Sequence, residues 1–155
     1  MKKLFLLFAL TPLLSYAQIA QDNVMLSANT PLIFSYTSVD ELQVPKIIQN
    51  ALELKLAPKN YSRNIMASVN FVGLSQNQIP ADWLSLRLVN KSSINAIVYK
   101  NQISISPTPI LLFTQPPTPA NQDLIFDYDL ILNPLHSFIT TGTFTFNIII
   151  SISQS

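Results

Sequence analysis

Cysteine is absent from this chain of 155 residues, so no disulfide can stabilise the fold and no lipid can be attached at a cysteine. Hydrophobic residues make up 48% of the sequence, which supplies enough apolar surface to offset the entropy lost on ordering the chain. A chain of this length buries roughly two-thirds of its unfolded surface when it folds. We therefore expect one ordered domain that depends on its hydrophobic core alone.

Charged residues are also scarce. They make up 11% of the chain, against roughly 25% in typical soluble proteins, and the formal net charge is +1. Nucleic-acid binding depends on clustered Lys and Arg side chains, which displace counterions from the phosphates. The near-neutral composition therefore excludes a nucleic-acid partner.

His136 is the only histidine, which excludes a metal site built from several histidines. A Ser-His-Asp triad would have this one residue as its possible base. His136 follows Asn133 and Pro134 in a predicted loop, and we interpret it as an exposed loop residue without a catalytic role.

Glycine is rare, with two residues, whereas proline occurs eleven times. Tight two-residue hairpins usually require glycine at positive φ, so most connections here must be longer, with Asn in left-handed positions. This ratio favours crossing connections of the Greek-key type. Proline also protects sheet edges, because it has no N–H to donate to a neighbouring strand.

The first seventeen residues have the three parts of a signal peptide. Lys2 and Lys3 precede an apolar run over residues 4–14, and Ser15 and Ala17 place small side chains where signal peptidase requires them. A membrane anchor is the alternative, but this run is shorter than the roughly 20 residues needed to span a bilayer and contains a proline.

Cleavage after this segment would leave Gln18 at the new N-terminus. We expect a bacterial protein exported to the periplasm or to the cell surface and the extracellular space. Residues 18–155 would form a single domain that does not span the membrane, since the remaining apolar stretches are too short.

The remaining chain shows the two-residue period of β-strands with one buried face. From Thr143 to Ser153, apolar and polar residues alternate, and Ile149 alone breaks the pattern. Together with the proline-rich and asparagine-rich breaks, this pattern predicts an all-β fold, an Ig-like or Greek-key sandwich of about eight to ten strands. The candidate strands are residues 24–27, 32–36, 51–56, 65–72, 84–89, 94–100, 103–106, 110–114, 124–132 and 143–153. A helical pattern competes over residues 44–54, where we expect at most one helical turn before a strand.

Two acidic residues are the weak candidates for a metal or catalytic site. Asp127 and Asp129 lie two positions apart in a predicted strand, so their carboxyl groups project from the same face. Such a pair can bind a hard cation or act as acid and base in a hydrolase. A solvated strand face explains them more simply, because Ca²⁺ requires six or more oxygen ligands. We expect no cofactor and no enzymatic activity.

Aromatic residues are the candidates for ligand binding. Trp83 can stack on a sugar or pack over one end of the core as the chain enters a strand. Tyr61 beside Arg63 and Tyr99 beside Lys100 allow the same two interpretations.

Three stretches, residues 31–34, 50–56 and 141–148, together resemble the secreted Ig-like domains of bacterial fimbrial and surface-coat subunits. The last stretch, with Gly142 before an alternating aromatic strand, is similar to the closing strand of such subunits. The sequence departs from the chaperone-dependent subunits in having no cysteine, since those commonly contain a disulfide. The resemblance implies no enzyme activity and no catalytic residues.

Two functions follow as expectations. The first is an exported structural or adhesive surface protein, with a fimbrial-like subunit as one form, which associates with other protein subunits or surface components by strand-edge pairing. The second is a secreted carbohydrate-binding or ligand-binding module that uses Trp83, Tyr61 and Tyr99.

Overall fold

The computed structural model describes residues 24–36, 38, 40–72, 80, 82–92, 97–118, 123–134 and 145–155. The expected signal peptide and His136 lie outside these residues, so both stay predictions. The described part consists of strands and one short 3-10 helix, η1 (Asp40–Gln43). The strands are β1 (Val24–Ala28), β2 (Lys46–Leu56), β3 (Arg63–Val72), β4 (Leu84–Lys91), β5 (Gln102–Ile105), β6 (Ile110–Gln115), β7 (Leu124–Leu132) and β8 (Thr145–Gln154).

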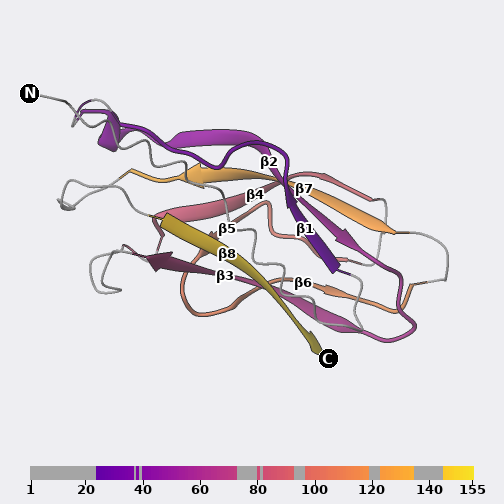
Figure 1. The fold of residues 1–155 in the computed structure, drawn as a ribbon. Coiled ribbons are helices and arrows are strands. Elements are labelled where there is room, and N and C mark those ends of the chain that lie inside the picture. Colours follow the sequence, from indigo (N-terminus) through magenta and orange to yellow (C-terminus); the bar gives the residue numbers. More distant parts are fainter. Residues whose placement is uncertain are drawn as a thin grey trace, which may run out of the picture.

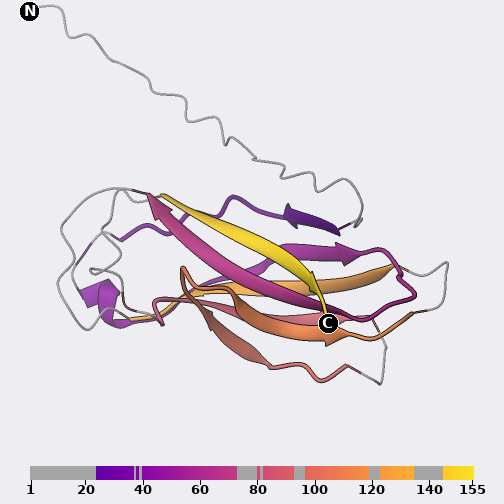
Figure 2. The same cartoon turned by 90° about the horizontal axis from the view of Figure 1, so that it is seen from below.

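The strands form two antiparallel sheets that face each other (Figures 1 and 2). One sheet has five strands in the order β1-β2-β7-β4-β5, and the other has three in the order β6-β3-β8. The all-β sandwich predicted from the alternating pattern is therefore confirmed.

Most connections cross from one sheet to the other. Among the described strands, β1 with β2 and β4 with β5 are the consecutive strands that also lie side by side. Each remaining pair of consecutive described strands lies in two different sheets. Figure 1 shows this for β7 and β8. This arrangement agrees with the expectation from the low glycine content that crossing connections would outnumber tight hairpins.

The core lies between the two sheets, and the alternation within each strand explains it. In β2, Leu52, Leu54 and Leu56 are buried, whereas Glu53 and Lys55 between them are only half-buried. Burying one such leucine side chain contributes about 1.5–3 kcal/mol. The other strands add inward residues in the same way, among them Ile65, Ala67, Val69, Leu84, Leu86, Ile103, Ile105, Leu112, Phe113, Leu124, Phe126, Tyr128, Leu130 and Leu132.

Several strand boundaries differ from those expected. β7 coincides with the predicted range, whereas β2 begins five residues earlier than expected, at Lys46. The helical turn falls before this strand, in η1, and not within residues 44–54. Residues 97–100, part of a predicted strand, are described without regular structure.

The predicted strand at residues 32–36 is extended but belongs to neither sheet. Leu32, Phe34 and Tyr36 are half-buried and alternate with exposed neighbours, as in a strand. The preceding Pro31 has no N–H to donate to a ladder. The Lys46 ammonium group instead donates to the carbonyl of Ser35, so a side chain holds this segment against the start of β2.

Candidate functional site

The free edge of β8 is the candidate functional site. Among the described residues, β8 pairs with β3 alone and ends the three-stranded sheet. The β3–β8 register runs without a shift from Arg63 opposite Gln154 to Val72 opposite Thr145. Every second N–H and C=O group of β8 therefore points away from β3, toward the side on which no described strand pairs with β8.

The amino-acid composition of β8 is typical of a strand that has a neighbouring strand on each side. The strand contains no charged residue and no proline. Its inward residues Phe146, Ile148, Ile150 and Ile152 pack against the core but remain only half-buried. On the inward face of β7, by contrast, the side chains are fully buried. The edge therefore combines unpaired backbone groups with partly uncovered apolar side chains.

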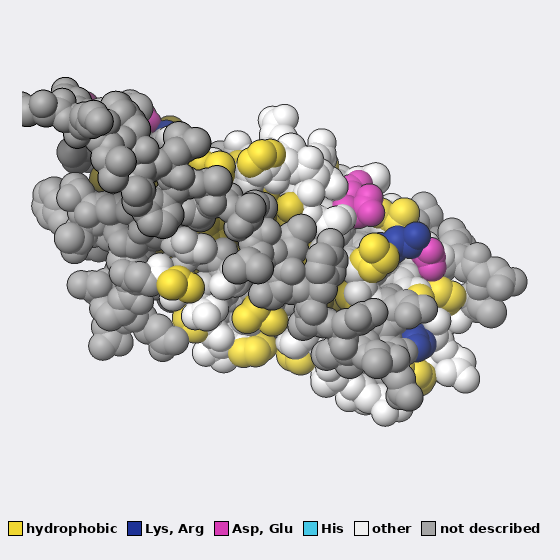
Figure 3. Space-filling model, in the orientation of Figure 1, with side chains coloured by type: hydrophobic (Ala, Val, Ile, Leu, Met, Phe, Trp, Pro, Cys, Tyr) yellow, Lys and Arg dark blue, Asp and Glu magenta, His cyan; other side chains and the backbone are white. Residues whose placement is uncertain are grey.

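The outer surface around β8 is also nearly free of charge. Ile149 points outward and is 47% exposed. In the face drawn in Figure 3, most of the visible charged side chains lie toward the right-hand end of the molecule. A long strand edge without charged side chains is a template for pairing with another strand.

The other three sheet edges are shorter or interrupted. β1 has five residues, β5 has four, and β6 has six residues bounded by Pro109 and Pro116. The pairing of β6 with β3 also contains a register shift between Ile65 and Met66. Short strands, prolines and bulges are the features by which natural proteins block edge pairing. β8, with ten residues and none of these features, is the exception.

The N-terminal half of β8 lies next to the extended segment 31–36. The rings of Phe34 and Phe146 are 6.4 Å apart between centroids, and Phe71 of β3 lies at the same distance from Phe146. These aromatic contacts place the start of β8 beside segment 31–36, which belongs to neither sheet. Among the described residues, no ladder joins this segment to β8.

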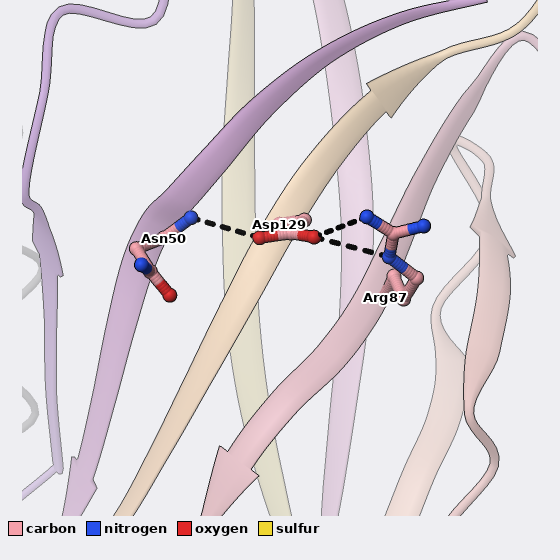
Figure 4. Close-up of polar contacts among 3 residues, drawn as sticks. All are labelled: Asn50, Arg87 and Asp129. Atoms are coloured by element: carbon pink, nitrogen blue, oxygen red, sulfur yellow. Dashed lines mark hydrogen bonds and ion pairs between the residues drawn. The ribbon is translucent and has the colours of Figure 1, made fainter.

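Asp129 lies on the outer face of β7 and is almost fully buried, with 4% of its surface exposed. Its Oδ1 accepts a hydrogen bond from the backbone N–H of Asn50 at 2.8 Å, and its Oδ2 accepts from Nε and Nη2 of Arg87 at 3.0 and 2.5 Å (Figure 4). Asn50 has a φ of 46°, and the β2–β7 register shifts between Ile48 and Leu52. The carboxylate therefore secures an irregular point of β2 and ties β4 to it.

Asp127 has a separate partner, since its Oδ2 accepts a hydrogen bond from Nδ2 of Asn90 at 3.1 Å. Within the described ranges, no group of three or more His, Cys, Asp or Glu side chains is arranged to hold a metal ion. The two acidic candidates thus accept hydrogen bonds from different residues of β4. The interpretation of this pair as a hydrolase or cation site stays a prediction.

Trp83 is 6% exposed and packs into one end of the core. Its ring stacks on Phe71 with centroids 5.5 Å apart and an interplanar angle of 18°. Its buried Nε1–H has no hydrogen-bond partner among the described residues. This placement corresponds to the packing interpretation of Trp83, and stacking on a sugar stays a prediction.

The two candidate tyrosines lie apart from Trp83. The Lys59 ammonium group is 6.0 Å from the ring of Tyr61, just before β3, whereas Trp83 stacks near the far end of that strand. At about 3.3 Å per residue, Arg63 at the start of β3 and Phe71 beneath Trp83 are roughly 26 Å apart. The structure therefore does not bring Tyr61 and Trp83 together on one surface.

Tyr99 packs between the two sheets. Its ring lies 5.4 Å from Phe113 and 5.6 Å from Phe126, and the Lys91 ammonium group sits 4.1 Å from the ring centroid. Burial raises the pKa of Tyr99 to about 12. Its hydroxyl group has no hydrogen-bond partner within the part of the chain that the structure describes.

Sequence reasoning missed Arg63, which is completely buried at the start of β3. Its Nε donates to Oε1 of Gln115 at 2.8 Å, and its Nη2 donates to the carbonyl of Ala57 at 2.5 Å. The signal was present in the alternation, because counting back by two from the inward Ile65 puts position 63 on the inward face. The Arg63 guanidinium group therefore links β3 to β6 and to the residue that follows β2, at one end of the sandwich.

No family model matches the chain, and no curated protein proved similar to it. Across the described residues, no helix has the length and apolar character needed to cross a membrane.

Proposed function

We propose that this chain is an exported, non-enzymatic structural or adhesive protein of the bacterial periplasm or cell surface. It associates with other protein subunits or surface components by adding a strand to its sheet. The expected signal peptide and the resemblance to fimbrial and surface-coat domains support this proposal. The observation that carries it is the open edge of β8, ten residues long and without charge or proline.

Strand addition matches the two parts of this edge. The backbone groups that point away from β3 can bond to an incoming strand, which supplies affinity for almost any sequence. The half-buried Phe146, Ile148, Ile150 and Ile152 select a partner strand with apolar residues at alternate positions. Such a strand would continue the small sheet and complete the cover over the core.

Size-exclusion chromatography with light scattering tests the proposal on residues 18–155. We expect mass to rise with protein concentration, or a stable complex to form with surface material of the native cell. A protein that stays a strict monomer and binds no partner would contradict the proposal.

A matched pair of variants locates the association. Asn147 of β8 and Asn70 of β3 are exposed register partners, but Asn147 alone lies on the edge strand. We expect Asn147→Lys to weaken association at least about tenfold, because a charged edge resists strand pairing, and Asn70→Lys to change it much less. Equal effects of the two substitutions would place the contact elsewhere. Circular dichroism of both variants verifies that each has folded.

A further inference from the structure

The residue pattern of β8 is symmetrical about Ile149. Moving outward from this residue in both directions, one meets isoleucine, then a polar residue, then a large apolar residue, then a hydroxyl residue. The positions that match are Ile148 with Ile150, Asn147 with Ser151, Phe146 with Ile152, and Thr145 with Ser153. A strand with this symmetry complements an antiparallel copy of itself.

From this complementarity we propose that β8 pairs with β8 of a second copy of this chain, antiparallel and with the two Ile149 residues opposite each other. The inference rests on the proposed function and names the partner strand for the same edge. Residues opposite one another in an antiparallel pair lie on the same face of the sheet. In this register, every inward apolar residue therefore meets an inward apolar residue, and every outward polar residue meets an outward polar residue.

Neighbouring registers lose this match. A shift that centres the pair on Ile148 places Asn147 opposite Ile149. A shift that centres it on Ile150 places Phe146 opposite Gln154. A shift by a single residue would set the inward face of one copy against the outward face of the other. The arrangement centred on Ile149 is thus the one that the side chains select.

The paired edge would join two small sheets into one continuous sheet of six strands, related by a two-fold axis perpendicular to the sheet at Ile149. The half-buried inward residues of the two copies would then lie side by side, and the Ile149 side chains would cover each other on the outer face. No charged side chain of β8 opposes the approach, because the strand has none. A second copy therefore satisfies both the backbone and the apolar requirements of the edge.

Ile149→Cys tests this register directly. The chain has no cysteine of its own, so the introduced thiol is the single reactive site. Ile125 provides the matched control, since it is an outward-facing isoleucine of comparable exposure, 38%, but lies on β7, which pairs with β2 and β4 on both sides. With a short bifunctional thiol reagent, we expect Ile149→Cys to form covalent dimers at least about tenfold faster than Ile125→Cys, because opposite Cβ atoms in a strand pair lie about 4.5–5.5 Å apart.

Ile149→Lys gives a second readout that does not depend on cross-linking. Two ammonium groups would face each other on the symmetry axis, and we expect the dissociation constant of the dimer to rise at least about tenfold relative to Ile125→Lys. Circular dichroism verifies that both variants retain the fold.

The outcomes separate this inference from the proposed function. If the protein self-associates or binds a partner, but the two cysteine variants cross-link at equal rates and Ile149→Lys leaves association unchanged, the β8–β8 pairing is overturned and the proposed function stands. If the unmodified protein is a monomer that pairs through β8 with a different chain, the pairing is likewise overturned. If it associates with nothing at all, both fall.

Discussion

Asn50 and Asp129 show how one residue can determine the path of a strand. A positive φ is costly for residues other than glycine, although Asn tolerates it better than most. Asn50 adopts this conformation at 46°, and its N–H reaches the carboxylate of Asp129. The hydrogen bond therefore offsets the backbone cost at the point where the β2–β7 register shifts.

Asp129→Ala should lower the free energy of unfolding by about 2–3 kcal/mol, because it leaves the Asn50 N–H without an acceptor and removes the partner of Arg87. Asp127→Ala is the matched control, since it removes an exposed contact to Asn90 from the same face and should cost less than about 0.5 kcal/mol. Urea unfolding followed by circular dichroism measures both. Equal losses would show that Asp129 has no special role.

Tyr99→Phe should raise the free energy of unfolding at neutral pH by about 1 kcal/mol, because the buried hydroxyl has no partner among the described residues. The pKa of Tyr99 is about 12 in the folded chain against an ordinary value of 10.0, so between these values the folded state holds more protons than the unfolded state. The contribution of Tyr99 to the free energy of unfolding is therefore complete below pH 10 and is lost as the pH rises toward 12.

The same substitution should make this alkaline loss of stability shallower. The loss should not vanish, since burial and the nearby Tyr99 also raise the pKa of Tyr128, whose burial persists in the variant. Urea unfolding at a series of pH values tests this point. A slope identical to that of the unmodified protein would rule out Tyr99 as a source of the pH dependence.

At the level of single residues, the sequence predicts the sheet face on which a side chain lies better than it predicts the residue that the side chain contacts. Alternation predicts that Asp127 and Asp129 point to the same side, and both reach side chains of β4. It does not predict that Asp129 holds Asn50, which lies 79 positions away along the chain. Such contacts depend on which strands become neighbours, and alternation within one strand carries no information about that.

Among the elements, the segment 31–36 marks the difference between burial and pairing. Its alternation predicts a strand, and the half-buried side chains confirm the buried face but not the pairing. Hydrophobic period reports which side of a segment meets the core, whereas a ladder also requires backbone donors in register. β7 satisfies both conditions, and its predicted and observed bounds coincide.

Lys46 fastens this segment through the Ser35 carbonyl, the Glu41 carboxylate at 2.5 Å and the ring of Tyr36 at 4.3 Å. We expect Lys46→Ala to speed amide hydrogen exchange over residues 31–36, with a global cost of at most about 1 kcal/mol. Lys55→Ala is the control, because Lys55 also pairs with a carboxylate, that of Asp123 at 2.9 Å, but not with this segment. Faster exchange in both variants, or in neither, would contradict the role of Lys46.

On the scale of the whole molecule, the predicted export determines where the sandwich folds. Mass spectrometry of protein recovered from its native cell should find Gln18 at the N-terminus. Ala17→Arg should block this cleavage, because signal peptidase requires a small side chain at that position. Exported protein that still begins with Met1 would show that the segment is not a cleaved signal.

The order of the strands also determines when folding can be completed. β8 follows the other described strands along the sequence, whereas its ladder partner β3 lies two strands after β1. If the chain is exported as predicted, β3 has no partner on its β8 side until β8 has left the translocation channel. Closing the long loop between β3 and β8 should slow folding. A chain that stalls before β8 emerges would leave the side of β3 free to pair with a strand of another molecule.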